Sequence, residues 1–238
     1  MKAKIDKPTD MVAVKTMAHL FLRLDITETP VSPLVVKHPF IESAVHAIKT
    51  DKGMEVKNLL EDEDALAEVR EHYAQRIDEA KTPLEIYVIL SKPYRLTFLK
   101  YVEEYLSDND FAKFLADGWV SSENPNGDVN VSLRTFVKWF RRADKKLLMT
   151  DEDYKVYRDL PSTFRVYRGV AVGRNPKGLS WTRNLSTAEW FAKRFDTKDK
   201  KGYIQTAEIS RSDALAYFNT RGEDEIVADS FKMDITIM

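Results

Sequence analysis

The chain has 238 residues, of which 43% are hydrophobic and 32% are charged, and its formal net charge is −1. This composition can bury a core, and the near-neutral balance excludes a global field that would draw the chain onto nucleic acid or an anionic membrane. The chain has no cysteine, which excludes a disulfide scaffold, a thiol nucleophile and a cysteine-ligated zinc site. The same absence fits a cytoplasmic protein without requiring one.

The first two-thirds of the chain is predicted to be helical. Lys15, His19 and Arg23 interrupt the apolar segment Met11–Leu24, which favours an amphipathic helix over a signal peptide or a membrane span. Residues 121–128 are rich in Ser, Asn, Pro and Gly and predict a loop. Apolar residues at helical spacing predict further helices at Ile41 to Ile48, Leu66 to Ile77, Phe98 to Leu106, Phe111 to Trp119 and Leu133 to Phe140, while residues 84–90 fit a helix or a strand.

The last of these helices is basic. A solvated outer face is the favoured interpretation of its charges, and contact with nucleic acid or a phosphate is the alternative. The basic residues that surround the helix are Lys138, Arg141, Arg142, Lys145 and Lys146.

After Pro161 the pattern changes from helical spacing to short alternating segments. Apolar residues alternate with polar ones over Phe164–Val170, which is typical of a strand. Ser186 and Glu189 are spaced as a capping box that opens a helix. Further strands are predicted at 179–182, 203–209, 215–218, 225–229 and 231–237, with a polar loop at 173–178. We therefore expect an α+β protein, with a helical domain at 1–155 and a β-rich domain at 156–238.

The β-rich part carries three polar features that ordinary strands do not need. The first is Arg168, which lies on the apolar face of its predicted strand. The second is a pair of hydroxyls, Ser180 and Thr182, on either side of Trp181. The third is the turn Arg221–Glu225, in which Glu223 and Glu225 point to the same side if the strand begins near Glu223.

The order of these motifs, with the helix that follows the second, resembles the arginine–serine–glutamate class of ADP-ribosyltransferases. The resemblance covers only the last third of the chain, and Trp181 and Thr182 depart from the family's Ser-Thr-Ser pattern. It implies a split β-sheet core, NAD as the co-substrate and release of nicotinamide. The first two-thirds looks similar to proteins of bacteriophages and bacteria. A phage effector, a toxin and a housekeeping regulator all stay open, and the expected location is the cytoplasm, which is the host's if a phage encodes the protein.

The resemblance also implies roles for the motif residues. Glu225 would stabilise positive charge that develops on the ribose, as a carboxylate does in glycoside hydrolysis, and Ser180 would fix its rotamer. Glu223 would act on the acceptor. Arg168 would bind the pyrophosphate, because a guanidinium pairs with phosphate oxygens bidentately.

Other residues are expected to complete the NAD site. Gly169 would let the NAD carboxamide approach the backbone, and Thr182 would support the second strand. An aromatic ring would cover the nicotinamide, and the candidates are Trp181, Phe195 and Tyr203.

Several alternatives stay open. The resemblance implies transfer to an arginine of a host protein, but water or nucleic acid could be the acceptor, and a catalytically inactive binding protein is a further alternative. The helical part would dock the substrate or complete the NAD cleft. No metal is implied: the four histidines form no His-Glu-x-x-His motif and are better explained by packing and capping.

Overall fold

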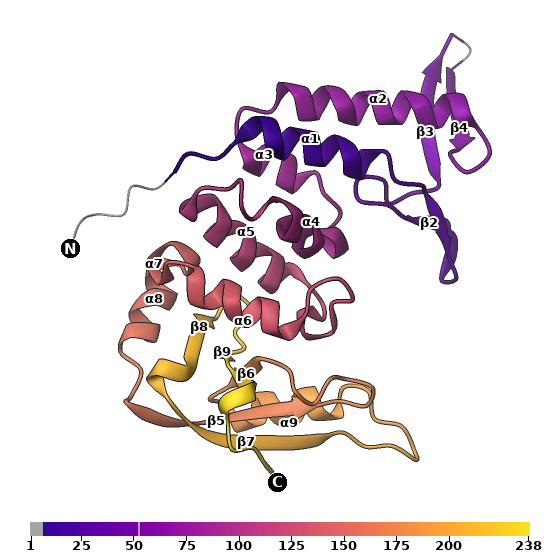
Figure 1. Ribbon diagram of the computed structural model, residues 1–238. Coiled ribbons are helices and arrows are strands. Elements are labelled where there is room, and N and C mark those ends of the chain that lie inside the picture. Colours follow the sequence, from indigo (N-terminus) through magenta and orange to yellow (C-terminus); the bar gives the residue numbers. More distant parts are fainter. Residues whose placement is uncertain (1–6, 52) are drawn as a thin grey trace. The chain divides into compact units, whose positions relative to one another are not determined.

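The computed structural model describes residues 7–51 and 53–238. It divides the chain into two compact units, Met1–Phe114 and Leu115–Met238, and each unit combines helices with antiparallel strands. The expected α+β class is therefore observed (Figure 1).

The boundary between the units differs from the predicted division into 1–155 and 156–238. Helices α6 (Leu133–Arg142) and α8 (Asp151–Arg158) contact strand β8 (Ala214–Phe218), so they belong with the C-terminal sheet.

The first unit has a helical core. Helix α1 begins after Asp10, whose carboxylate accepts hydrogen bonds from the amides of Val12 and Ala13 at 3.0 Å each. It buries Val14 and Ala18, so the predicted amphipathic helix is confirmed. The elements of this unit are α1 (Met11–Leu22), β1 (Thr27–Thr29), β2 (Ser32–Lys37), β3 (Val45–Thr50), β4 (Gly53–Asn58), α2 (Glu63–Glu79), α3 (Pro83–Val88), the 3-10 turn η1 (Lys92–Tyr94) and α4 (Arg95–Val102).

Two hairpins make the expectation of an all-helical N-terminal part wrong. The spacing of Ile41, Val45 and Ile48 fits a helix, but β3 instead pairs antiparallel with β4. Gly53 pairs with Thr50 at the end of this hairpin and has φ 124°, a conformation that glycine adopts without steric cost. The turn therefore overrides the helical spacing.

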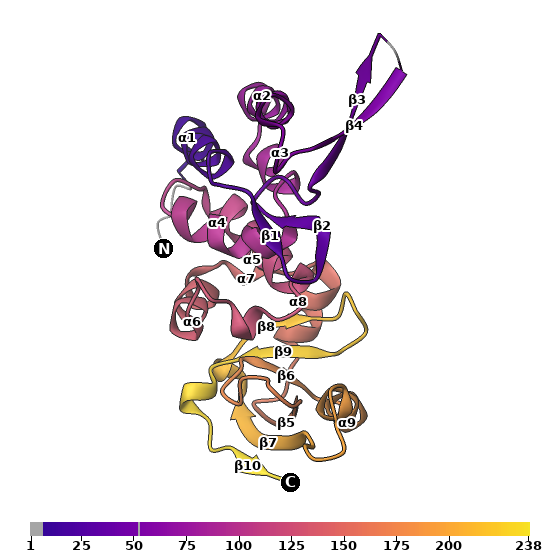
Figure 2. The same ribbon diagram turned by 90° about the vertical axis from the view of Figure 1, so that its right-hand side faces the viewer.

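The second unit is built on an antiparallel sheet. Within residues 115–238, all of which are described, the strand order is β10-β7-β5-β6-β9-β8, which can be followed in Figure 2. Helix α5 (Asp108–Ser121) begins in the first unit and ends in the second. The other elements are η2 (Pro125–Gly127), α7 (Lys145–Leu148), β5 (Thr163–Val170), β6 (Ser180–Thr182), α9 (Leu185–Lys193), β7 (Tyr203–Ser210), η3 (Arg211–Asp213), β9 (Glu225–Ala228), η4 (Ser230–Lys232) and β10 (Thr236–Ile237).

Strand register aligns polar motif residues in one row. Thr182 lies opposite Tyr167 of β5 on one side and opposite Glu225 of β9 on the other. Glu225 in turn lies opposite Phe218 of β8. Residues that are directly opposite in antiparallel strands present their side chains to the same face, so the second and third sequence motifs meet on one face of the sheet.

Two local predictions in this unit are wrong. The capping box at Ser186 does not form, because α9 starts two residues earlier, with the Asn184 side chain accepting the amide of Ser186 at 2.9 Å. The predicted strand at 231–237 is reduced to Thr236–Ile237. The Asp229 carboxylate accepts the Phe231 amide at 3.3 Å and starts a 3-10 turn there.

An aromatic cluster supports the sheet from α5 and α6. Trp119 makes edge contacts with Phe136 and Phe140, at centroid distances of 5.1 and 5.0 Å. Phe140 also meets Phe218 of β8 at 6.4 Å. These rings are almost wholly buried, so they fix the end of α5 against β8. Among the helices of the described residues, none is long and apolar enough to cross a membrane.

Candidate functional site

A cavity of about 480 Å³ lies in the second unit, a volume typical of small-molecule sites, which span roughly 300–1,000 Å³. Its walls come from the end of α5, the loop that follows it, the strands β5 and β6, helix α9 and the turn between β8 and β9. The cavity brings the three sequence motifs together. The predicted site residues that line it are Arg168, Gly169, Ser180, Trp181, Thr182, Glu223 and Glu225.

Glu225 is the most strongly held carboxyl group of the cavity. The indole Nε1 of Trp119 donates to its Oε1 at 3.0 Å. Burial raises the pKa of Glu225, while hydrogen bonds from Ser180 and Trp119 oppose the rise. Two donors of this kind fix the rotamer of the side chain and favour its ionised form.

The hydroxyl of Ser180 is oriented by Asn126 of η2. Asn126 Nδ2 donates to Ser180 Oγ at 2.8 Å, and Asn126 Oδ1 accepts the amide of Leu179, which fixes the orientation of the amide group. Because Ser180 Oγ accepts from Asn126, its single proton is directed to Glu225. The sequence assigned residues 121–128 to a loop and missed this contact, since one asparagine in a loop carries no signal of its partner.

Trp119 was also missed. Its position at helical spacing from Phe111 and Leu115 indicated only a buried helix face, and it is indeed 1% exposed. Nothing in a helical apolar pattern reveals that one indole N–H meets a carboxylate 106 residues further along the chain.

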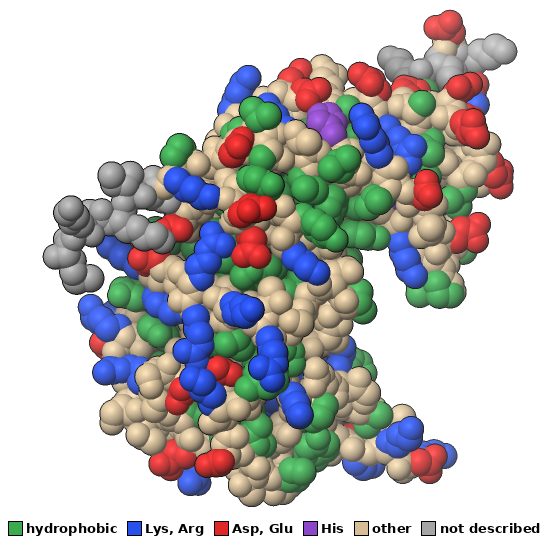
Figure 3. All heavy atoms as spheres, viewed as in Figure 1, with side chains coloured by type: hydrophobic (Ala, Val, Ile, Leu, Met, Phe, Trp, Pro, Cys, Tyr) green, Lys and Arg blue, Asp and Glu red, His purple; other side chains and the backbone are tan. Residues whose placement is uncertain are grey.

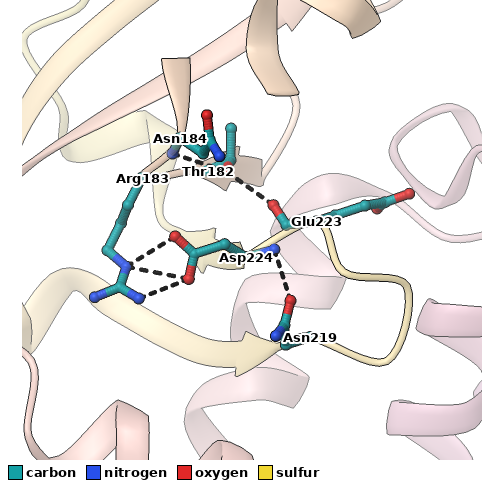
Figure 4. A network of polar contacts seen from close by, with 6 residues as sticks. All are labelled: Thr182, Arg183, Asn184, Asn219, Glu223 and Asp224. Atoms are coloured by element: carbon teal, nitrogen blue, oxygen red, sulfur yellow. Dashed lines mark hydrogen bonds and ion pairs between the residues drawn. The ribbon is translucent and has the colours of Figure 1, made fainter. Parts of the chain in front are cut away.

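The turn that carries Glu223 is held by a bidentate ion pair (Figure 4). Both Nε and Nη2 of Arg183 donate to the Asp224 carboxylate, the shortest contact being 2.6 Å. Asp224 has φ 49°, a left-handed conformation that aspartate tolerates better than most residues. Its amide donates to Asn219 Oδ1 at 3.0 Å. Arg183 and Asn219 therefore both restrain the turn at Asp224.

Thr182 ties this turn to the sheet. Its Oγ1 donates to the carbonyl oxygen of Glu223 at 2.8 Å and accepts the amide of Asn184 at 3.1 Å. One hydroxyl thus connects the Glu223 backbone to the start of α9. This geometry is compatible with the expected supporting role of Thr182.

Glu223 lines the cavity near the positively charged Arg221 and Arg194 and the negatively charged Glu123. In Figure 4 its side chain points away from the Arg183–Asp224 pair. The strand begins only at Glu225, so the alternation expected from an earlier strand start does not apply, although both glutamates line the cavity. Burial raises the pKa of Glu223, and Arg221 and Arg194 oppose the rise.

Arg168 is buried, as its place on the apolar face of β5 predicts. Its Nη1 donates to the Ser180 carbonyl at 2.7 Å and its Nη2 to the Asn175 carbonyl at 3.0 Å. Burial lowers the pKa of this guanidinium to about 10. Two of its donors thus bind backbone carbonyls, so Arg168 orders β6 and the loop before it.

Gly169 lines the cavity with its backbone, but its missing side chain serves packing. A Cβ atom here would lie 2.1 Å from the Ala188 carbonyl oxygen and 2.5 Å from the Ala192 nitrogen. Glycine therefore lets α9 approach β5 closely. The expected reason for this glycine was the approach of a ligand carboxamide, and that reason does not explain its close contact with α9.

Arginine and aromatic side chains gather at one part of the cavity wall. Arg174 lies 4.9 Å and Arg194 lies 5.3 Å from the ring centroid of Phe195. Arg194 also lies 5.5 Å from the ring of Trp190, which is 58% exposed. Cations over exposed rings keep both groups in place without burying them.

The exposure of these rings narrows the choice of the aromatic residue that could cover a ring of a bound ligand. Phe195 lines the cavity and is 41% exposed. Trp181 is only 2% exposed, and Tyr203 is not among the residues of the second unit that line the cavity. Phe195 and Trp190, which was not among the candidates, are the most exposed rings that line the cavity, and the partly exposed Tyr167 and Phe191 line it as well.

The site has the groups that NAD would require. Its carboxyl groups can stabilise a cation and take up a proton, its exposed guanidiniums can pair with phosphates, and its exposed rings can stack on a planar base. Across the described parts of the chain, no three His, Asp or Glu side chains are grouped as metal ligands.

The chain was compared with protein family models, with curated proteins and with solved structures, and none of the three comparisons gave a match. Function is therefore inferred from the residues of the cavity.

Proposed function

We propose that this protein is an NAD-dependent mono-ADP-ribosyltransferase that modifies an arginine side chain of a protein. The observation that carries the proposal is the position of Glu225, which accepts a hydrogen bond from Trp119 and one from Ser180 inside a cavity that Glu223 also lines. The aligned row of Tyr167, Thr182 and Glu225 in the sheet supports an ADP-ribosyltransferase-like core.

When bound, NAD supplies a ribose carbon whose bond to nicotinamide breaks with positive charge developing on the sugar. The ionised carboxylate of Glu225 stabilises that charge. The contribution is large because the carboxylate is held in place before the reaction. Trp119 and Ser180 prevent the side chain from rotating away.

Glu223 serves the acceptor. A guanidinium is always protonated near neutral pH, so an incoming arginine is attracted by a carboxylate before it reacts. Glu123 also lines the cavity and pairs with Arg194 at 3.5 Å. As the new bond forms, the acceptor loses a proton, and the raised pKa of Glu223 suits it to take that proton.

Arg174 and Arg194 are the proposed phosphate ligands, because both line the cavity and neither is buried as Arg168 is. Phe195 or Trp190 covers a ring of the dinucleotide. Arg168 acts indirectly, by holding the Ser180 and Asn175 carbonyls.

The test is incubation of the full chain with NAD and an arginine-rich acceptor protein. Released nicotinamide and the intact mass of the acceptor are measured together. We expect an ADP-ribose adduct with the wild-type protein, and a rate reduced about 100- to 1,000-fold in Glu225→Gln. Glu208→Gln, which changes an exposed glutamate of β7, is the matched control and should keep the full rate.

The products distinguish the alternatives. Nicotinamide and free ADP-ribose without any adduct would make the protein an NAD glycohydrolase. An adduct on added nucleic acid, absent from protein, would reassign the acceptor. Absence of both NAD cleavage and a thermal shift with NAD would reject the proposal in favour of a binding protein.

A further inference from the structure

One face of helix α6 is basic along its whole length. Arg134, Lys138, Arg141 and Arg142 recur every three or four residues, which places them on one side of a helix. All four are exposed, while Phe136, Trp139 and Phe140 on the other side are buried. Figure 3 shows Lys and Arg side chains gathered over this helix.

Helix α6 itself contains no Asp or Glu. No Asp or Glu occurs between Asp128 and Asp144. Arg141 is paired with the buried Asp229 at 2.9 Å, so it anchors the helix to the end of β9. Lys145 is half-buried and donates to the Phe140 carbonyl, whereas Lys146 is exposed.

The positive surface continues beyond α6. The guanidinium of Arg134 lies 4.9 Å from the ring centroid of Phe231, which is 42% exposed. The neighbouring Ser230 donates to the carbonyl of Lys177 at 2.8 Å, and the Lys177 side chain is exposed. The exposed Phe231 ring thus lies beside Arg134, and the residue before it contacts the backbone of Lys177.

The segment that carries Lys177 continues to the wall of the cavity. The Lys177 amide donates to Asn175 Oδ1 at 2.9 Å, and the adjacent Arg174 lines the cavity against Phe195. We call the set Arg134, Lys138, Arg142, Lys177 and Phe231 the basic track. The contacts connect it, step by step, to the proposed active site.

We propose that the basic track binds a single strand of nucleic acid. Repeated cations match the repeated phosphate charges of a nucleic acid strand. An exposed ring beside an arginine offers a surface on which a base can stack. An acidic protein would match the cations but has no base to stack on the ring. The segment that carries Lys177 adjoins Arg174 on the cavity wall, so a bound strand would present one end, or a protein bound to it, near Glu223. This inference does not require that the protein cleave NAD.

The test measures binding of a fluorescein-labelled single-stranded RNA oligonucleotide to the full chain, without NAD, over a series of salt concentrations. The double variant Arg134→Gln/Lys138→Gln should bind more weakly. Its slope of log affinity against log salt should fall by roughly 0.7 for each phosphate that the variant no longer neutralises. Lys198→Gln/Lys200→Gln removes two exposed cations from the loop between α9 and β7 and is the matched control.

The variant Phe231→Leu tests whether a base stacks on the Phe231 ring. It should weaken binding about tenfold at every salt concentration and leave the slope unchanged, since base stacking on an aromatic ring contributes ~1–3 kcal/mol. An unlabelled DNA strand of the same length should compete, and poly-glutamate should not.

Three results would overturn the inference. They are no binding at low salt, equal weakening by the control and track variants, or equal competition by poly-glutamate, which would show a surface for any polyanion. Thermal unfolding of each variant identifies one that fails to fold, and in that case Lys138→Gln alone replaces the double variant.

Discussion

Trp119 Nε1 donates to Glu225 Oε1 at 3.0 Å, so the last turn of α5 and the first residue of β9 share one hydrogen bond. We expect Trp119→Phe to lower kcat for NAD cleavage about 10- to 100-fold, because a hydrogen bond to a charged group contributes ~1.5–3 kcal/mol. The KM for NAD should change little. Steady-state kinetics checks this, and an unchanged kcat in a folded variant would remove Trp119 from the site.

The rate of NAD cleavage should fall on acidification. Burial raises the pKa of Glu225 above 4.5, so its carboxylate takes up a proton at a higher pH than an exposed glutamate does. The protonated form cannot stabilise a cation. The acid limb of kcat should therefore have a midpoint above 4.5, and in Trp119→Phe it should move to still higher pH, because a hydrogen bond that lowers the pKa is removed. A limb at or below 4.5 would contradict this assignment.

The Arg183–Asp224 pair should control the placement of both glutamates. Asp224→Ala removes the bidentate pair and leaves a residue with φ 49° that lacks the local polar contacts of aspartate. We expect a loss of about 1–3 kcal/mol in the free energy of unfolding and a reduced kcat. Asp224→Asn, which tolerates the left-handed conformation, should lose less stability. Equal effects of the two variants would show that charge alone matters.

Arginine substitutions should separate binding from structure. Arg174→Gln should raise the KM for NAD about tenfold with unchanged thermal stability, because it removes a phosphate ligand from the cavity wall. Arg168→Lys should instead lower stability, since one ammonium cannot reproduce the planar bridge to the carbonyls of Ser180 and Asn175. Thermal unfolding and steady-state kinetics of both variants measure these two effects. The reverse pattern would restore Arg168 as the phosphate ligand.

The first unit should lose stability in mild acid through His38. Its Nδ1 accepts the amides of Phe40 and Ile41 at 3.1 Å, so the ring must be neutral. Burial lowers the pKa of His38 from 6.5 to about 4. On acidification through 6.5 the unfolded chain takes up a proton that the folded chain does not. Stability is therefore full above 6.5 and falls by on the order of 2–3 kcal/mol as the pH approaches 4.

Urea unfolding between pH 7 and pH 4 measures this loss. His38→Gln should be less stable at pH 7 and less dependent on pH, while His72→Gln, which changes an exposed histidine, should keep the wild-type pH dependence. An unchanged pH dependence in His38→Gln would assign the effect to other groups.

Local patterns in the sequence were sufficient to predict several elements. Apolar residues at helical spacing predicted α1 and α2, and alternation predicted β5 with Arg168 on its buried face. The order of the polar motifs indicated residues that the cavity brings together. Each of these inferences depends on neighbours a few residues apart, where chain geometry alone relates the side chains.

Other features depended on the tertiary structure. The hairpin of β3 and β4 replaced an expected helix, because strand pairing and a glycine turn outweighed the apolar spacing of three residues. Helix α9 begins after Asn184 and not after Ser186, because the Asn184 side chain accepts the amides of Ser186 and Thr187 at the start of the helix.

The amino-acid sequence by itself determined the α+β class, most helices and the polar residues of the site. Only the tertiary structure decided that Trp119 and Asn126 hold Glu225 and Ser180, and that Arg134 of α6 lies over the ring of Phe231. These partners are 106 and 54 residues apart. Their meeting results from the packing of whole elements around a shared core, and no local pattern of residues encodes it.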